Sequence, residues 1–329
     1  MKKFKVVLTD YEYDTLEPEM RVLEQLNAEI ITAQCKTEED VIHIAKDADG
    51  IIHQYAPFTK RVIDQLENCK VIARYGIGFD TVDIDAATEK GIFVTNVTDY
   101  CLDEVADHAV AMLLTLARKI VTLNNSVKSG EWDYKVSKPI YRLKNRALGL
   151  VGFGNIPRNV AKKAQAFGLK VIAYDPFVPA EVAEEMNVDL VELDELCRRS
   201  DFISIHTPLN KHTRGMVGFE QFNLMKKEAC IINTARGPII DEQALIEALE
   251  QKKIAAAALD VLEKEPINSD HPLLRMENVL LTPHVAFYSE ESEMDLKQKT
   301  AQNVVDVLKG QLPKYLVNRS VQEKFSLKR

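Results

Sequence analysis

Four residues in the last third of the chain are of types that could act together in acid–base chemistry on a small anionic molecule. They are Arg236, Asp260, Glu265 and His284, and each lies at or shortly after the end of an apolar run that is typical of a β-strand. Open parallel α/β sheets place ligand chemistry at the carboxyl ends of their strands. The sequence therefore predicts that an anion-binding group, carboxylates and a histidine converge at one sheet edge.

The chemistry that these types allow is hydride addition to a carbonyl with matched proton transfer. A guanidinium such as that of Arg236 can hold the carboxylate of a 2-oxo acid and polarise its carbonyl through forked donors. The alkoxide then formed needs a proton, which a histidine such as His284 can give and take back. A carboxylate at the other imidazole nitrogen would favour the protonated ring and fix its tautomer. Residue types alone leave Glu263 and Glu265 open for that role, and a surface ion pair or a solvated loop charge remains an alternative at each position.

A glycine-containing loop with the sequence Gly-Phe-Gly-Asn-Ile-Pro occupies residues 152–157, between an apolar run at Ala147–Val151 and a helical segment at 158–167. Gly152 would allow a tight turn, and Gly154 would let backbone N–H groups approach a pyrophosphate at a helix start. Pro157 departs from the usual third glycine, although proline is tolerated in the first helical turn. We expect cofactor binding with altered local packing; the alternative is an ordinary turn.

The next apolar run, Lys170–Tyr174, is followed by Asp175, where such folds hydrogen-bond the adenosine ribose. A carboxylate accepts from ribose hydroxyls but repels a 2′-phosphate. Asp175 therefore favours NAD over NADP as the cofactor.

The remaining pattern alternates short apolar runs with helix-like segments, which is typical of parallel α/β sheets. Strands are expected at 5–8, 29–33, 50–53, 70–74 and 92–96, and then at 147–153, 170–174, 202–206, 229–234, 254–260 and 278–282. The apolar stretch 102–123 predicts one largely buried helix, on which Asp107 and His108 would be packing or interface residues. His53 and His206 also end strands, and a structural role is expected for both.

Composition limits the classes of function. With 329 residues, two domains of roughly 100 to 200 residues each are expected. A formal net charge of −8 without a Lys/Arg block argues against nucleic acid or a membrane as partner. The five cysteines show no CxxC spacing, so neither a metal site nor a disulfide framework is expected. No signal-like or membrane-spanning run occurs, which favours the cytoplasm and a small-molecule substrate.

At these residues, and over nearly its whole length, the sequence resembles the D-isomer-specific 2-hydroxyacid dehydrogenases, and within them the branch that includes the C-terminal binding proteins. The segments that carry the resemblance are 74–80, 96–108, 152–157, 233–237, 259–266, 282–284 and 288–290.

The resemblance implies that Arg236, Glu265 and His284 are catalytic, and so selects Glu265 over Glu263. It implies that Asp260 holds the nicotinamide carboxamide. The substrate contacts that it implies are Arg74, Gly76, Ile77, Gly78 and Arg236, and glycine there suits close approach of N–H groups to an anion. The cofactor contacts that it implies are Gly152, Gly154, Asn155, Ile156, Asp175, Thr207, Pro208, Thr213, Thr234, Ala235, Arg236, Asp260 and His284.

The family's architecture implies two doubly wound parallel-sheet α/β domains. A Rossmann NAD-binding domain at 100–292 would be inserted into a flavodoxin-like substrate-binding domain at 1–99 and 293–329. Relatives are usually homodimers built through their cofactor domains, and an apolar helix from Leu102 agrees with that arrangement.

The implied function is NAD-dependent reduction of a 2-oxo acid to the D-2-hydroxy acid, with His284 as general acid and base. One alternative is an NAD(H)-sensing interaction protein similar to a corepressor. Another is oxidation of 3-phosphoglycerate, which we rank lower because the short C-terminal tail leaves no room for the regulatory domain that many such enzymes carry.

Overall fold

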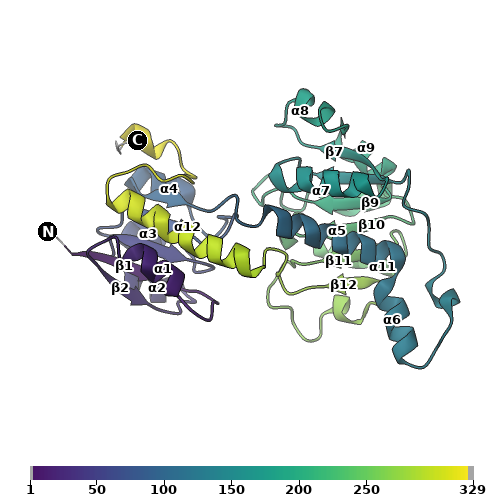
Figure 1. Cartoon of the computed structure of the whole chain (residues 1–329), viewed down its shortest axis with the longest axis horizontal. Helices are drawn as coiled ribbons and strands as arrows, with labels where there is room; N and C mark the ends of the chain where they lie inside the picture. The colour runs from purple at the N-terminus through teal and green to yellow at the C-terminus, as the bar shows by residue number, and fades with distance from the viewer. Residues whose placement is uncertain (1–2, 325–329) are drawn as a thin grey trace. The chain divides into compact units, whose positions relative to one another are not determined.

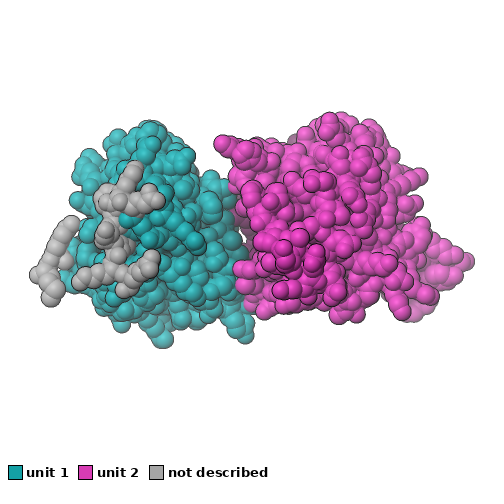
Figure 2. Space-filling view, turned by 90° about the horizontal axis from the view of Figure 1, so that it is seen from above, with its two compact units in different colours: residues 1–101, 289–329 teal, residues 102–288 magenta. Residues whose placement is uncertain are grey.

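Two parallel β-sheets, each with its own covering helices, organise the chain (Figure 1). The computed structural model describes residues 3–324. The chain divides into two compact units, unit 1 with residues 1–101 and 289–329 and unit 2 with residues 102–288, which Figure 2 shows in separate colours. The prediction of two doubly wound α/β sheets is confirmed.

Unit 1 contains a five-stranded parallel sheet in the order β2-β1-β3-β4-β5. Its strands are β1 (Phe4–Leu8), β2 (Ala28–Thr32), β3 (Gly50–His53), β4 (Val71–Arg74) and β5 (Phe93–Thr95). Its helices are α1 (Glu17–Leu23), α2 (Glu38–Ala45), α3 (Lys60–Gln65), α4 (Ile84–Lys90), α12 (Glu290–Leu308) and α13 (Val321–Lys324). This strand order is that of flavodoxin-like sheets.

The faces of the unit 1 sheet are buried under different helices. One cluster joins residues of β1 and β4 to Leu23 of α1 and to Leu296 and Val304 of α12. The other joins the opposite faces of these strands to α2, α3 and α4. Because both faces are covered, β3 and β4 are apolar nearly throughout rather than alternating.

Unit 2 contains a seven-stranded parallel sheet in the order β12-β11-β10-β9-β6-β7-β8. Its strands are β6 (Ala147–Val151), β7 (Lys170–Tyr174), β8 (Asp189–Leu190), β9 (Phe202–Ile205), β10 (Cys230–Asn233), β11 (Ala256–Leu259) and β12 (Val279–Leu281). Its helices are α5 (Leu102–Arg118), α6 (Ile120–Lys128), α7 (Asn155–Ala166), α8 (Ala180–Glu184), α9 (Leu193–Arg199), α10 (Phe219–Leu224) and α11 (Glu242–Glu250), with 3₁₀ turns at Tyr134–Ser137, Gly237–Ile239 and Pro272–Arg275.

The order of strands in unit 2 reverses between β6 and β9, which lie side by side at the centre of the sheet. Helices α5 and α7 cover one face, and α9, α10 and α11 cover the other. Ligands of such sheets bind outside the carboxyl ends of the strands at this reversal. The predicted glycine loop follows β6 at that point.

The structure differs from the sequence predictions at two elements. The expected single helix at 102–123 is two helices, because Lys119 adopts a left-handed conformation (φ 51°) between α5 and α6. Helix α6 buries none of its residues, so only the first half of the stretch is a buried helix. The two-residue strand β8 was not predicted, because a run this short at a sheet edge has no periodicity.

The units meet in sequence at 101/102 and 288/289, whereas the predicted limits were 99/100 and 292/293. Helix α12 explains the second limit. Ser289 caps it by accepting the Ser292 N–H at 2.9 Å, so the helix starts at Glu290, and it packs against α1 and strands β3, β4 and β5 of unit 1. Among the described residues, no helix combines the length and apolar character needed to cross a membrane.

Candidate active site

The turn after β10 presents Arg236 and is braced by one side chain. Asn233 Nδ2 donates to the Arg236 carbonyl at 2.9 Å, and Asn233 Oδ1 accepts the Ala235 N–H at 3.0 Å. Arg236 Nη1 donates to the Ala235 carbonyl at 2.8 Å. The buried asparagine at the end of the strand thus fixes the backbone from which the half-buried arginine projects.

Gly237 allows this turn to lie directly against the loop after β11. A Cβ atom at Gly237 would lie 1.9 Å from the Leu262 carbonyl carbon and 2.0 Å from its oxygen. These are backbone atoms, which cannot move aside as the end of a flexible side chain can. Glycine is therefore required for Arg236 and the segment that carries Glu265 to share one edge of the sheet.

Glu265 and His284 form a hydrogen-bonded pair. His284 Nδ1 lies 2.7 Å from Glu265 Oε2, and Glu265 Oε1 accepts the Leu262 N–H at 2.9 Å. The Glu263 N–H instead donates to Glu242 Oε2 at 3.2 Å. Of the two carboxylates that residue types left open, the structure brings Glu265 to the imidazole.

The surroundings of Glu265 keep its carboxyl group ionised. Burial by itself would raise its pKa, but the hydrogen bond and charge of His284 outweigh burial, aided by the Leu262 N–H and by Arg236. The net result is a Glu265 pKa below the ordinary value. A carboxylate that stays charged at neutral pH can stabilise a protonated imidazole and hold its tautomer.

His284 itself has a left-handed backbone, with φ 53°. Its N–H donates to the Asp260 carbonyl at 2.8 Å. The Asp260 carboxylate accepts the next two backbone N–H groups, from Val285 and Ala286, each at 2.9 Å, and the Thr282 hydroxyl at 2.5 Å. Asp260, which the resemblance assigns to the nicotinamide carboxamide, thus also holds the loop that carries His284.

Sequence reasoning missed the role of His108 in this arrangement. The sequence predicts a packing or interface residue at this position, but His108 Nε2 lies 3.0 Å from Thr282 Oγ1 and 3.7 Å from Asp260 Oδ1. The available signal was a titratable side chain in a helix predicted to be largely buried. Asp107, its neighbour, pairs with Lys163 on the exposed surface.

The glycine loop has the backbone that the motif predicts. Gly152 has φ 96°, and a Cβ there would lie 3.0 Å from backbone atoms of His206 and Thr207. Gly154 is the N-cap of α7, and a Cβ there would meet nothing within 4 Å. Asn155 and Ile156 are the first two residues of α7. Pro157 follows them, buried, where an N–H would have no partner within the helix.

Asp175 lies across from this loop. Its Oδ2 accepts the Phe153 N–H at 2.8 Å, and its Oδ1 accepts the Phe177 N–H at 2.9 Å. The carboxylate therefore ties the glycine loop to the end of β7. Each oxygen retains a second lone pair with which to accept from a ribose hydroxyl.

Other predicted cofactor contacts lie on neighbouring strand ends. Thr213 Oγ1 donates to the Pro208 carbonyl at 2.6 Å and so closes the loop after β9, which includes Thr207. The Thr234 hydroxyl, at the end of β10, is buried and has no hydrogen-bond partner among the described residues. A buried donor without a partner, together with the open space above Gly154, fits a bound dinucleotide.

The predicted substrate loop belongs to unit 1 and follows β4. Gly76 has φ 122°, and a Cβ there would lie 1.8 Å from Arg74 Nη1. The Gly76 carbonyl accepts the Val97 N–H at 3.0 Å, and the Ile77 carbonyl accepts from Asn96 Nδ2 at 2.7 Å. These contacts fix the backbone that leads to Gly78.

The other two strand-end histidines are held in the fold. His206 Nε2 lies 2.8 Å from the Ser204 hydroxyl. His53 is fully buried against Phe58, with ring centroids 4.7 Å apart, and burial lowers its pKa to about 3. His53 is therefore neutral at physiological pH.

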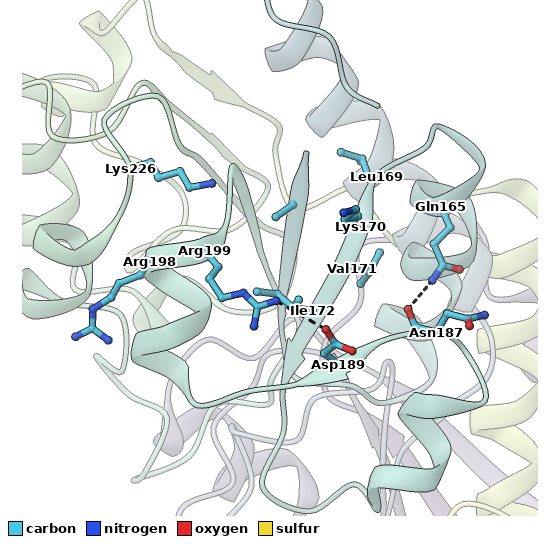
Figure 3. A pocket seen from close by; sticks show the side chains of 11 residues that line it. Gln165, Leu169, Lys170, Val171, Ile172, Asn187, Asp189, Arg198, Arg199 and Lys226 are labelled. Atoms are coloured by element: carbon cyan, nitrogen blue, oxygen red, sulfur yellow. Dashed lines mark hydrogen bonds and ion pairs between the residues drawn. The ribbon is translucent and has the colours of Figure 1, made fainter. Parts of the chain in front are cut away.

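A pocket with basic side chains lies at the opposite edge of the unit 2 sheet, at the amino ends of β6 and β7 (Figure 3). Three of its cations, Arg198, Arg199 and Lys226, are paired with carboxylates. Arg199 lies 2.8 Å from Glu195 and 3.8 Å from Asp189, and Lys226 lies 3.0 Å from Asp201. Because it faces away from the strand ends that carry Gly152 and Asp175, this pocket is not part of the candidate active site.

The two doubly wound sheets and the glycine loop define a dinucleotide-binding α/β protein. Residues 110–286 match the family model described as D-isomer specific 2-hydroxyacid dehydrogenase, NAD binding domain. The chain belongs to the D-isomer specific 2-hydroxyacid dehydrogenase family, as its motifs predicted, and NAD is the cofactor of the matched domain.

Individual relatives carry different names. The chain is 44% identical to D-3-phosphoglycerate dehydrogenase of Methanocaldococcus jannaschii over 316 residues, which are 95% of this chain and 59% of that protein. It is 41% identical to glyoxylate reductase of Thermococcus litoralis over 270 residues, 80% of this chain and 81% of that protein. The crystal structure of D-lactate dehydrogenase from Aquifex aeolicus complexed with NAD and lactic acid superimposes with a TM-score of 0.85 at 30% identity, covering 95% and 99% of the two chains.

Proposed function

We propose that this protein is an NAD-dependent D-2-hydroxyacid dehydrogenase that reduces a 2-oxo acid to the D-2-hydroxy acid. The observation that carries this proposal is the hydrogen-bonded pair of His284 and Glu265, which lies on the edge of the sheet that also presents Arg236. An acid, the carboxylate that supports it and an anion-binding guanidinium are the groups that the reaction requires.

The residues act on the substrate in distinct ways. NADH, when bound, supplies the hydride that adds to the C2 carbon of the substrate. Arg236 binds the substrate carboxylate and polarises the carbonyl through its forked donors. Because Nδ1 of His284 faces Glu265, Nε2 is the nitrogen that gives its proton to the carbonyl oxygen. Oxidation of the hydroxy acid reverses both transfers.

A second candidate substrate is 3-phosphoglycerate, which would be oxidised at its hydroxyl group. It is favoured by the identities of 44% and 40% to proteins named D-3-phosphoglycerate dehydrogenase, although the chain spans only 59% and 54% of their lengths. Arg236, Glu265 and His284 would serve this reaction too, since 3-phosphoglycerate is itself a 2-hydroxy acid. Assays of 2-oxo acid reduction with NADH and of 3-phosphoglycerate oxidation with NAD distinguish the two candidate substrates.

The deciding experiment measures NADH oxidation at 340 nm with a panel of 2-oxo acids, including glyoxylate, hydroxypyruvate, pyruvate and phenylpyruvate, and NAD reduction with 3-phosphoglycerate. Turnover of any 2-oxo acid supports the proposal, and the acid with the highest turnover shows which substrate side chain the enzyme prefers. If NADH binds but nothing is turned over, the NAD(H)-sensing interaction protein becomes the better hypothesis.

We also propose that the protein is a homodimer built through unit 2. Helix α6 and the segment after it expose apolar side chains, with Ile120 54%, Trp132 90% and Tyr134 66% accessible. Apolar surface of this extent is typical of an interface. Sedimentation velocity at several concentrations should give about twice the mass of one chain, and a concentration-independent monomer would contradict the proposal.

A further inference from the structure

A chain of hydrogen bonds connects helix α5 to the loop that carries His284. His108 Nε2 lies 3.0 Å from Thr282 Oγ1, and this hydroxyl donates to Asp260 Oδ1 at 2.5 Å. The Asp260 carboxylate then accepts both backbone N–H groups that follow His284. The Asp260 carboxylate therefore binds residues on both sides of His284 in the sequence, Thr282 before it and Val285 and Ala286 after it.

The direction of this chain follows from the number of protons. The Thr282 hydroxyl has one hydrogen, and at 2.5 Å from a carboxylate it donates that hydrogen to Asp260. A lone pair of the hydroxyl then accepts from His108 Nε2, so the neutral ring is the tautomer with its proton on Nε2, and the charged ring would donate in the same way. His108 thus acts as a donor that orients the hydroxyl, and its side chain is 24% exposed while that of Asp260 is 1% exposed.

The loop needs such support because His284 has a left-handed backbone, which is strained for a residue other than glycine. This conformation persists only where surrounding contacts over-determine it. Loss of the His108 donor would free the Thr282 hydroxyl to rotate away from Asp260. The carboxylate would then hold the His284 loop with one contact fewer.

We propose that His108 is a positioning residue for His284, acting through Thr282 and Asp260 on the backbone of the loop. The inference rests on the proposed function, in which His284 transfers the proton. It gives helix α5 a role in catalysis beyond packing, because the first half of the helix sets the geometry of a residue more than 170 positions later.

Two substitutions separate positioning from packing. His108→Leu removes the donor, and we expect kcat to fall about tenfold while the dissociation constant of NADH and the KM of the oxo acid change less than about twofold. His108→Gln keeps an N–H near the position of Nε2 and should restore kcat to within about threefold of the original. Asp107→Asn is the matched control, since it alters the neighbouring exposed ion pair with Lys163 and should leave kcat unchanged.

A second readout does not depend on turnover. In the protein without substrate, the ¹H–¹³C imidazole signals of His284 report its environment, and they should broaden or double in the Leu variant but not in the Gln variant. Equal losses of kcat in both variants, or unchanged His284 signals in the Leu variant, would overturn the inference. If no oxo acid is reduced by the unaltered protein while the Leu variant still perturbs His284, the proposed function fails and the positioning role stands.

Discussion

The histidine at residue 284 is the group whose removal should affect chemistry most directly. We predict that His284→Ala lowers kcat by about 10²- to 10⁴-fold, the usual contribution of a positioned acid or base. NADH binding, measured by fluorescence titration, should stay within about twofold because the glycine loop is untouched. Exposed His43 provides the control, since His43→Ala should change neither quantity. Unchanged turnover in the His284 variant would remove this residue from the mechanism.

Asp175 should decide between the two nicotinamide cofactors. We predict that Asp175→Ala raises the ratio of kcat/KM with NADPH to that with NADH by about tenfold, because like-charge repulsion of a 2′-phosphate is lost. Binding of NADH should also weaken, since the carboxylate holds the Phe153 N–H. Asp189→Ala, on the exposed edge strand β8, is the matched control. A constant cofactor ratio would show that Asp175 does not contact the ribose.

At the scale of elements, the close approach of the loops after β10 and β11 depends on Gly237. We predict that Gly237→Ala lowers kcat/KM by about 10²-fold, because a methyl group would push the Leu262 backbone and shift Glu265 by the order of 1 Å from its position. A lower Tm should accompany this loss. Gly218→Ala, whose Cβ would lie 3.5 Å from the nearest atom, should keep both values. Full activity in the Gly237 variant would contradict the packing described here.

Much of this arrangement could be predicted from sequence, and the exceptions have physical causes. The apolar run before Arg236 located this residue at a strand end, because β10 is buried on both faces and such parallel strands are apolar throughout. The run before His284 is also apolar, although edge strand β12 is only half-buried. Residue types did not separate Glu263 from Glu265, since both follow the same strand and only the path of the loop selects one. The left-handed Lys119 and the contact of His108 with Thr282 were not predictable, because neither depends on a local pattern.

At the scale of the whole molecule, buried His53 should make unit 1 sensitive to acid. Burial, aided by the charge of Arg74, lowers the pKa of His53 from 6.5 to about 3, so the unfolded chain binds a proton that the folded unit does not. Above pH 6.5, His53 should therefore not reduce the free energy of unfolding. As the pH falls from 6.5 to 3, the free energy of unfolding should decrease by up to about 1.4 kcal/mol per pH unit.

Denaturant unfolding of the His53→Leu variant between pH 4 and 7 checks this prediction. The variant should lose less stability on acidification than the original protein, whereas His43→Leu, at an exposed position, should not alter the slope. Identical slopes for all three proteins would show that His53 is not the group that titrates.

The insertion of unit 2 between two segments of unit 1 constrains the order in which the protein can fold during synthesis. Strands β1 to β5 lie within the first 95 residues to be synthesised. Leu296, Val304 and the other α12 residues that cover one face of their sheet come just over 200 residues later. At a rate of synthesis of about 5 to 20 residues per second, one face of the sheet stays exposed for roughly 10 to 40 seconds before α12 is synthesised. Unit 2 is complete in sequence before then. The unit begun first is therefore finished last, and its uncovered apolar face is where a chaperone would be expected to bind the nascent chain.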